Sequence, residues 1–177
     1  MSKKARHKSD LLSLFAAFPN SSAEEKIANY ILSNSNLPGR RANLELANAL
    51  MEVVAELSSS RDVATLWEYC YQLTAITIEE GPVNTPREFL PFCGTCGLGA
   101  IGAMHPDFLP EALQRLQELA TDARWRMREA VRMALQQLLA GKTTTVQQAL
   151  EQWVEKDNWL VLRAVATSTG EQCLKMD

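Results

Sequence analysis

Histidine is scarce in this sequence, which removes the commonest partner of a catalytic nucleophile. The 177 residues contain two histidines. His7 lies in a basic N-terminal segment, and His105 precedes Pro106 where a helix is expected to end. Serine and threonine are plentiful, but a hydroxyl nucleophile needs an adjacent base to activate it. We therefore predict no catalytic residues and favour a protein that is not an enzyme.

Cysteine is also sparse, and the four residues present are too few for a disulfide scaffold. Cys93 and Cys96 form a CxxC pair. A redox motif of this kind needs a preceding strand in a βαβ unit, and here the surroundings predict helix. A zinc site would need His105 and Cys173 to complete four ligands, because no second CxxC is present. Small residues let helices approach closely, and the same expected helix carries several glycines between residues 94 and 102. We therefore favour buried packing for the cysteine pair, with no metal and no cofactor.

A glycine-rich phosphate loop and a membrane anchor are both missing. The glycines between residues 94 and 102 lie inside an expected helix without a lysine partner. The longest uncharged run, residues 89–106, is at the lower limit for a membrane span and contains Pro91 and several glycines. The basic start of the chain lacks the apolar stretch of a signal peptide. We expect a cytoplasmic protein without membrane contact.

Positive charge is in slight deficit, with a formal net charge of −3. A dedicated nucleic-acid-binding domain is usually basic, so this balance disfavours one but permits a local basic strip. Hydrophobic residues make up 46% and charged residues 22%, which suffices for a buried core. The length predicts a single domain or one stretch of repeats.

Strand signals are nearly absent, and helix signals are abundant. Capping boxes are expected at residues 22–25 and 85–88, where a Ser or Thr precedes a Glu by three positions. The C-terminal part predicts helices near residues 87–104, 108–120, 124–140, 144–156 and 159–170. Four weaker helical segments precede them. The short loops between these helices force neighbours to run antiparallel.

A sequence repeat organises these helices. Residues 122–131 read DARWRMREAV, and residues 157–165 read DNWLVLRAV. The two tryptophans are about 34 residues apart, a period typical of stacked helical pairs. Each pair would bury one face on the pair before it and one on the pair after it.

Three segments carry a family resemblance: LPGRRANLELA at residues 37–47, PVNTPREFLPFC at 82–93, and DARWRMREAV at 122–131. Together they resemble a bacterial family of uncharacterised HEAT-repeat proteins within the armadillo-type superfamily. The likeness spans residues 9–172. It implies an all-α fold, a right-handed α-solenoid of HEAT-like antiparallel helical pairs. It implies no activity.

The expected domain organisation is a basic disordered tail at residues 1–8 followed by one helical-repeat domain at residues 9–177. The last expected helix has no second helix to complete its pair. Its apolar residues, including Trp159, Leu160, Val161 and Val165, would then lie partly bare. We favour truncation of a longer chain; pairing with another copy or another protein is the alternative.

One row of arginines is the first candidate binding feature. Arg124, Arg128 and Arg132 follow at intervals of four, which places them on one side of a helix. If exposed, they would form a basic strip for phosphate or for an acidic partner surface.

Two structural interpretations compete with that strip. Glu129 is close enough in sequence to neutralise part of a solvated face. Alternatively, an arginine of the row bonds a carboxylate between repeats, with Asp122 and Asp157 as the candidates.

The tryptophans allow a second comparison. Trp125, Trp153 and Trp159 are favoured as packing residues between repeats, although exposed indoles could stack on bases. Trp125 with Glu129, and Trp159 with Arg163, occupy equivalent positions four residues apart. DNA alkylation-repair glycosylases of HEAT-like fold are similar in using Trp, Arg and a carboxylate on a concave face.

The sequence thus favours a non-catalytic binding or scaffold module whose partner is a protein. The alternative is a DNA-binding or DNA alkylation-repair-like glycosylase. Seven residues on two of the expected helices are the candidate binding residues: Arg124, Trp125, Arg128, Glu129, Arg132, Trp159 and Arg163. Self-association through the C-terminal repeat is a further expectation.

Overall fold

The chain is all-helical over the residues that the computed structural model describes, which are 1–141, 144–155 and 158–173. The α-helices within those ranges are α1 (Lys3–Phe15), α2 (Ser21–Ser33), α3 (Leu44–Ser58), α4 (Val63–Thr74), α5 (Phe89–Met104), α6 (Leu109–Leu119), α7 (Trp125–Ala140), α8 (Thr144–Val154) and α9 (Trp159–Cys173). Short 3₁₀ turns, Pro86–Glu88 and Pro106–Phe108, lead into α5 and α6.

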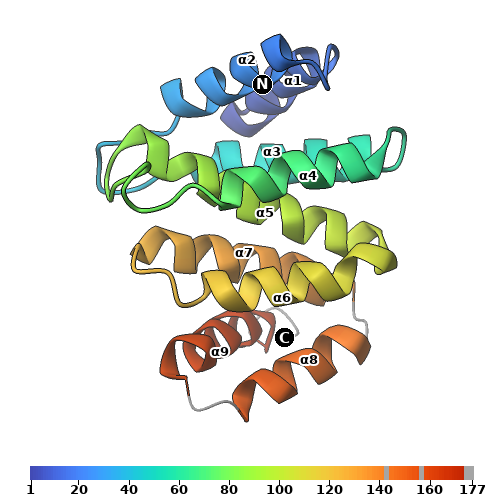
Figure 1. Ribbon diagram of the computed structural model, residues 1–177, viewed down its shortest axis with the longest axis vertical. Coiled ribbons are helices and arrows are strands. Elements are labelled where there is room, and N and C mark those ends of the chain that lie inside the picture. The colour runs from blue at the N-terminus through green and yellow to red at the C-terminus, as the bar shows by residue number, and fades with distance from the viewer. Residues whose placement is uncertain (142–143, 156–157, 174–177) are drawn as a thin grey trace.

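The helices form two layers along one direction of the molecule (Figure 1). In one layer the odd-numbered helices pack in sequence, α1 on α3, α3 on α5, α5 on α7 and α7 on α9. The even-numbered helices pack against this layer, α4 on α5 and α8 on α9 among them. Within the odd-numbered layer, neighbours in space are therefore two helices apart in the sequence, and α3, α5 and α7 each pack on an odd-numbered helix on both sides.

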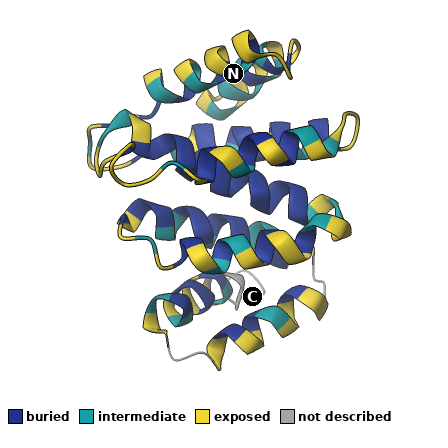
Figure 2. Cartoon of the chain, viewed as in Figure 1, coloured by how far each residue is buried: buried dark blue, intermediate teal, exposed yellow. Residues whose placement is uncertain are grey.

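Helix α5 is the centre of the core, and Figure 2 shows it in continuous dark blue. Every residue from Phe89 to Gly102 is buried. The helix contacts α3, α4 and α7 most extensively. An evenly apolar helix is expected to be covered on all sides, which is what the sequence of α5 dictates.

Two glycines let the neighbours of α5 approach closely. A Cβ built on Gly94 would lie 2.6 Å from the Cys70 carbonyl oxygen of α4, and one on Gly99 would lie 2.6 Å from the Ala134 Cβ of α7. The predicted use of small residues for close helix contact is therefore confirmed. Glycine inside a helix costs about 1 kcal/mol relative to Ala, so close packing offsets a poor propensity.

The N-terminal segment is a helix, and the expectation of a disordered tail at residues 1–8 is wrong. Ser2 caps α1 by accepting a hydrogen bond from Ala5 N at 3.2 Å. Lys8 forms ion pairs with Glu52 and Glu56 of α3, and Lys4 also pairs with Glu52. The basic residues that suggested a solvated tail are therefore matched by acidic residues of another helix.

Helix starts differ from the expected capping boxes. Asn20, rather than Ser22, caps α2 by accepting from Ala23 N at 2.8 Å. At α9, Asn158 accepts from Leu160 N at 3.1 Å and caps the helix. Asp157, one of the two candidates for a carboxylate between repeats, lies outside the described residues, as do residues 174–177 at the chain end.

The apolar side of α9 is better covered than was expected for a last helix without a second helix to complete its pair. Val161 and Val165 are buried against the core, and Leu160 is half-buried. Trp159 does lie bare, with 67% of its surface exposed. The reason is that α9 packs on both α7 and α8, so its apolar face has two neighbours.

None of the described helices combines the length and the apolar character that a membrane span requires.

A candidate binding groove between α7 and α9

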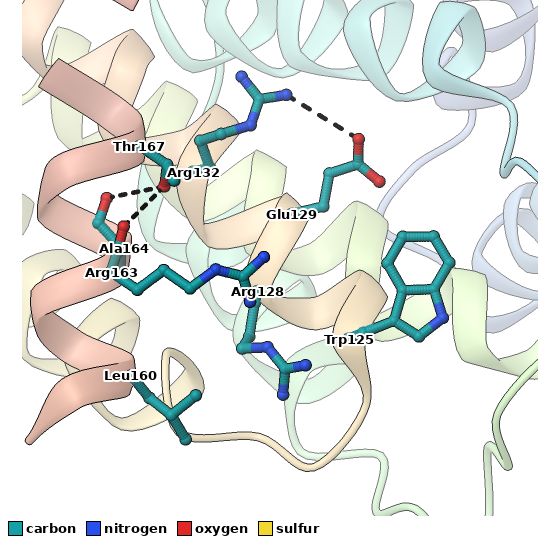
Figure 3. Close-up of a pocket in the computed structure, with 8 residues that line it drawn as sticks. All are labelled: Trp125, Arg128, Glu129, Arg132, Leu160, Arg163, Ala164 and Thr167. Carbon is teal, nitrogen blue, oxygen red and sulfur yellow. Dashed lines mark hydrogen bonds and ion pairs between the residues drawn. The ribbon is translucent and has the colours of Figure 1, made fainter. Parts of the chain in front are cut away.

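A groove with a volume of about 340 Å³ runs between α7 and α9 (Figure 3). Its lining residues from α7 are Trp125, Arg128, Glu129 and Arg132, and those from α9 are Leu160, Arg163, Ala164 and Thr167. Five of the seven candidate binding residues thus meet in one place. Arg124 and Trp159 do not line it.

The α7 wall of the groove carries two arginines and one carboxylate. Arg128 Nη1 donates to the Asp122 carbonyl oxygen at 3.0 Å, which holds that side chain toward the helix start. Arg132 Nη1 donates to Gln136 Oε1 at 2.9 Å, and Arg132 Nη2 lies 3.9 Å from Glu129 Oε1. Glu129 therefore neutralises part of this wall, as one of the structural interpretations predicted.

The α9 wall carries Arg163, which points from α9 toward α7 in Figure 3. The residue is exposed, and its guanidinium group makes no hydrogen bond or ion pair with any described residue. It lies one helical turn from Leu160 and Thr167, so the three side chains share one face of α9. Arg163 is consequently the groove cation that is most available to a ligand.

Trp125 stands at the edge of the groove with 44% of its surface exposed. One face of its ring is covered by Arg126, whose Cζ lies 4.5 Å from the ring centroid. The prediction that the repeat tryptophans serve packing is therefore wrong for Trp125 and Trp159 and confirmed for Trp153, which is 5% exposed. Both exposed tryptophans open their helices, where no preceding turn covers them.

Arg124 is buried, and the expectation of one exposed arginine row is wrong for this residue. Only 2% of its surface is accessible. Its guanidinium group bonds both oxygens of Asp122, at 3.0 and 2.8 Å. It also donates to the carbonyl oxygens of Ile76, Thr77 and Gly81 in the loop after α4. Arg124 precedes the first turn of α7, so it faces that loop rather than the groove.

Arg126 is also buried, and its contacts explain why the capping box expected at residues 85–88 does not form. Arg126 Nη1 donates to Glu88 Oε2 at 2.9 Å, and Glu88 is fully buried. Arg126 Nη2 donates to the Gly39 carbonyl oxygen at 2.7 Å. Glu88 also accepts from Asn84 N, so its carboxylate does not close a box with Thr85. This network links α7 to the loop before α3 and the loop before α5, and it orients Arg126, which covers one face of the Trp125 ring.

The CxxC pair has no chemistry at the surface. Cys93 and Cys96 are free thiols with no exposed area. Burial raises the pKa of both thiols, and burial raises the pKa of Cys70 to about 12. A reactive thiol needs a lowered pKa and access, so the redox interpretation is wrong. His105 bonds Ser58 at 3.0 Å instead of joining the pair, and the described residues hold no metal-binding cluster.

Three lining residues were not predicted: Leu160 as a groove wall, Ala164 and Thr167. Leu160 lies three residues before Arg163 and Thr167 four residues after it, a spacing that is visible in the sequence, and Ala164 follows Arg163 directly. What was missing was the position of α9 beside α7, which decides that this face of α9 looks into a groove.

No family model and no curated protein matches this chain. One solved structure, described as the crystal structure of an engineered protein, aligns over 94% of this chain and 74% of its own. Its sequence identity is 13% and its TM-score is 0.35, so neither fold nor function is transferred from it.

Proposed function

We propose that this chain is a right-handed α-solenoid of HEAT-like helical pairs and acts as a non-catalytic binding module. The groove between α7 and α9 holds an acidic segment of a protein partner. The sequential packing of the odd-numbered helices supports the solenoid. A cytoplasmic location and self-association through the C-terminal repeat belong to the same proposal.

The observation that carries the binding role is the unpaired Arg163 in a groove that two further arginines line. The planar guanidinium group of an arginine can bind a carboxylate through two parallel hydrogen bonds. The one carboxylate of the groove, Glu129, faces Arg132 and is partly occupied by it. The remaining cations favour an acidic ligand.

Capture from the native source tests this proposal with a charge-reversing variant. Wild type, Arg163→Glu and the matched control Arg40→Glu are cross-linked to their partners. Arg40 is exposed and does not line the groove. We expect a partner that wild type and Arg40→Glu recover and Arg163→Glu loses, with cross-links to an acidic segment. Recovery that is indifferent to Arg163→Glu refutes the proposal.

DNA binding is the second candidate, because Trp125, Glu129 and Arg163 do line one groove. Those are the residue types that DNA alkylation-repair glycosylases use. Trp159 lies outside the groove, and the formal net charge of −3 weakens attraction to a polyanion. Anisotropy titration of a labelled duplex at low salt decides the matter: salt-sensitive binding that Arg163→Glu abolishes favours DNA, and no binding excludes it.

A further inference from the structure

The charges that line the α7–α9 groove are unbalanced. Arg128, Arg132 and Arg163 contribute three guanidinium groups, and Glu129 contributes one carboxylate. The groove therefore carries two net positive charges in a chain whose formal net charge is −3. A single carboxylate of a ligand would neutralise half of this excess. A doubly charged group would neutralise all of it.

The surfaces next to this groove along α7 do not share the excess. A neighbouring pocket is lined by Gln137 of α7 together with residues of α1 and α3. There Lys4 and Lys8 are paired with Glu52 and Glu56, so the adjoining surface is nearly neutral. At the start of α7, Arg124 and Arg126 are buried in ion pairs. A ligand with its charge concentrated at one point fits this pattern better than an extended polyanion does.

The walls of the groove suit one side chain and its neighbours. Leu160, Ala164 and the open face of Trp125 provide apolar surface beside the arginines. The Thr167 hydroxyl donates to the Arg163 carbonyl oxygen at 2.8 Å, so the arginines remain the principal donors. The volume of about 340 Å³ admits a group of side-chain size rather than a folded surface.

We propose that this groove recognises a phosphorylated side chain, whose phosphate is a monoester dianion, in the partner protein. The inference rests on the proposed function and specifies its ligand. A phosphomonoester carries close to two negative charges at neutral pH and three acceptor oxygens. Arg163 and Arg128 supply donors for those oxygens, and the apolar wall takes the methylene groups beside them. A phosphodiester of nucleic acid carries one charge per phosphate and matches the groove less well.

Calorimetric titration with small probes tests the ligand class. The probes are N-acetyl-phosphoserine methylamide and, as the singly charged control, N-acetyl-glutamate methylamide. We expect wild type to bind the phosphoserine probe at least tenfold more tightly, about the ratio that one added charge-assisted hydrogen bond provides. Because the second phosphate pKa is about 6, this preference should shrink between about pH 7 and pH 5.

Variants then locate the site. Arg163→Gln should weaken the phosphoserine probe about ten- to hundredfold, and Arg40→Gln should leave it unchanged. Because Arg163 is exposed, both variants should keep the wild-type circular dichroism and melting temperature. An unchanged affinity in Arg163→Gln overturns the assignment.

The outcomes separate the two proposals. Equal binding of both probes, lost in Arg163→Gln, overturns the dianion preference and leaves the acidic-segment proposal standing. Binding of neither probe, with capture of an acidic partner still dependent on Arg163, also overturns the phosphate inference alone. Binding of a DNA oligonucleotide without either probe overturns both.

Discussion

Arg124 and Arg163 carry the same guanidinium group, and their surroundings give them different tasks. Arg124 is enclosed by Asp122 and three loop carbonyl oxygens. Arg163 extends into a groove without a described partner. In this all-helical protein the same residue type can thus bind a loop to a helix or remain available to a ligand. Burial and acceptor count decide which of the two it does.

Arg124→Gln should lower the free energy of unfolding by about 3–5 kcal/mol, because it leaves the Asp122 carboxylate without its positively charged partner. Urea denaturation measures the change. Arg40→Gln, at an exposed arginine, should cost little. Adding Asp122→Asn to Arg124→Gln should restore part of the loss, because no uncompensated carboxylate remains. A cost for Arg124→Gln no larger than that for Arg40→Gln would contradict the role of this cluster.

Tyr30 gives a pH-dependent test at the other end of the molecule. Burial, together with its hydrogen bond to Asp10 at 2.8 Å, raises the pKa of Tyr30 to about 12. The folded pKa exceeds the unfolded value of about 10, so the phenol's contribution to stability is complete below pH 10. It should be lost as the pH rises from about 10 to 12.

The measurement compares wild type with Tyr30→Phe in urea denaturation across the alkaline range. The stability of wild type relative to Tyr30→Phe should decline between about pH 10 and pH 12. Ultraviolet absorbance of tyrosinate follows the ionisation directly. A stability difference that stays constant through this range would show that Tyr30 ionises alike in both states.

At the scale of elements, α5 shows how a helix with poor propensity becomes the core. Its glycines and cysteines were visible as small residues, and their predicted packing role is confirmed. The CxxC pattern within it suggested other chemistry only as long as its surroundings were unknown. The start of α7 is the opposite case, because the spacing of its arginines did not predict that Arg124 is buried. The loop carbonyl groups that accept hydrogen bonds from Arg124 belong to a segment more than 40 residues earlier.

Gly99→Ala should destabilise the fold, since the added Cβ would lie 2.6 Å from Ala134 Cβ and 2.7 Å from Ala134 Cα. Overpacking of this kind costs roughly 1–3 kcal/mol, and the gain of about 1 kcal/mol in helix propensity offsets only part of it. The melting temperature should fall accordingly.

Gly170→Ala is the matched control, because a Cβ built on Gly170 in α9 has no atom within 4 Å apart from its chain neighbours and the backbone of its own helix. Its melting temperature should equal or exceed that of wild type, since only the propensity gain applies. A fall in both variants would show that the contact with Ala134 is not the cause.

At the scale of the whole molecule, charge is arranged in separate patches along the odd-numbered layer. Basic residues of α1 are matched by acidic residues of α3, and the groove between α7 and α9 retains a local excess. This arrangement favours a compact anionic ligand. It disfavours a polyanion that would follow the full length of the layer.

The salt dependence of binding follows from that arrangement. A ligand held by two or three arginines should show a logarithmic affinity that falls with logarithmic salt concentration with a slope of magnitude below about 3. A nucleic acid contacting six or more phosphates would give a slope of at least about 5. Titration of the captured partner at several salt concentrations distinguishes the two, and the steeper slope would favour the nucleic-acid alternative.

Helical periodicity, the Trp125 and Trp159 repeat and the small residues of α5 were sufficient to predict an all-helical chain, because these signals are local. The fates of Arg124, Glu88 and Trp125 were not predictable in the same way. Each depends on acceptors or cover supplied by segments distant in the sequence. Local patterns specify where helices form; the contacts between layers decide which charged side chains are buried and which face a ligand.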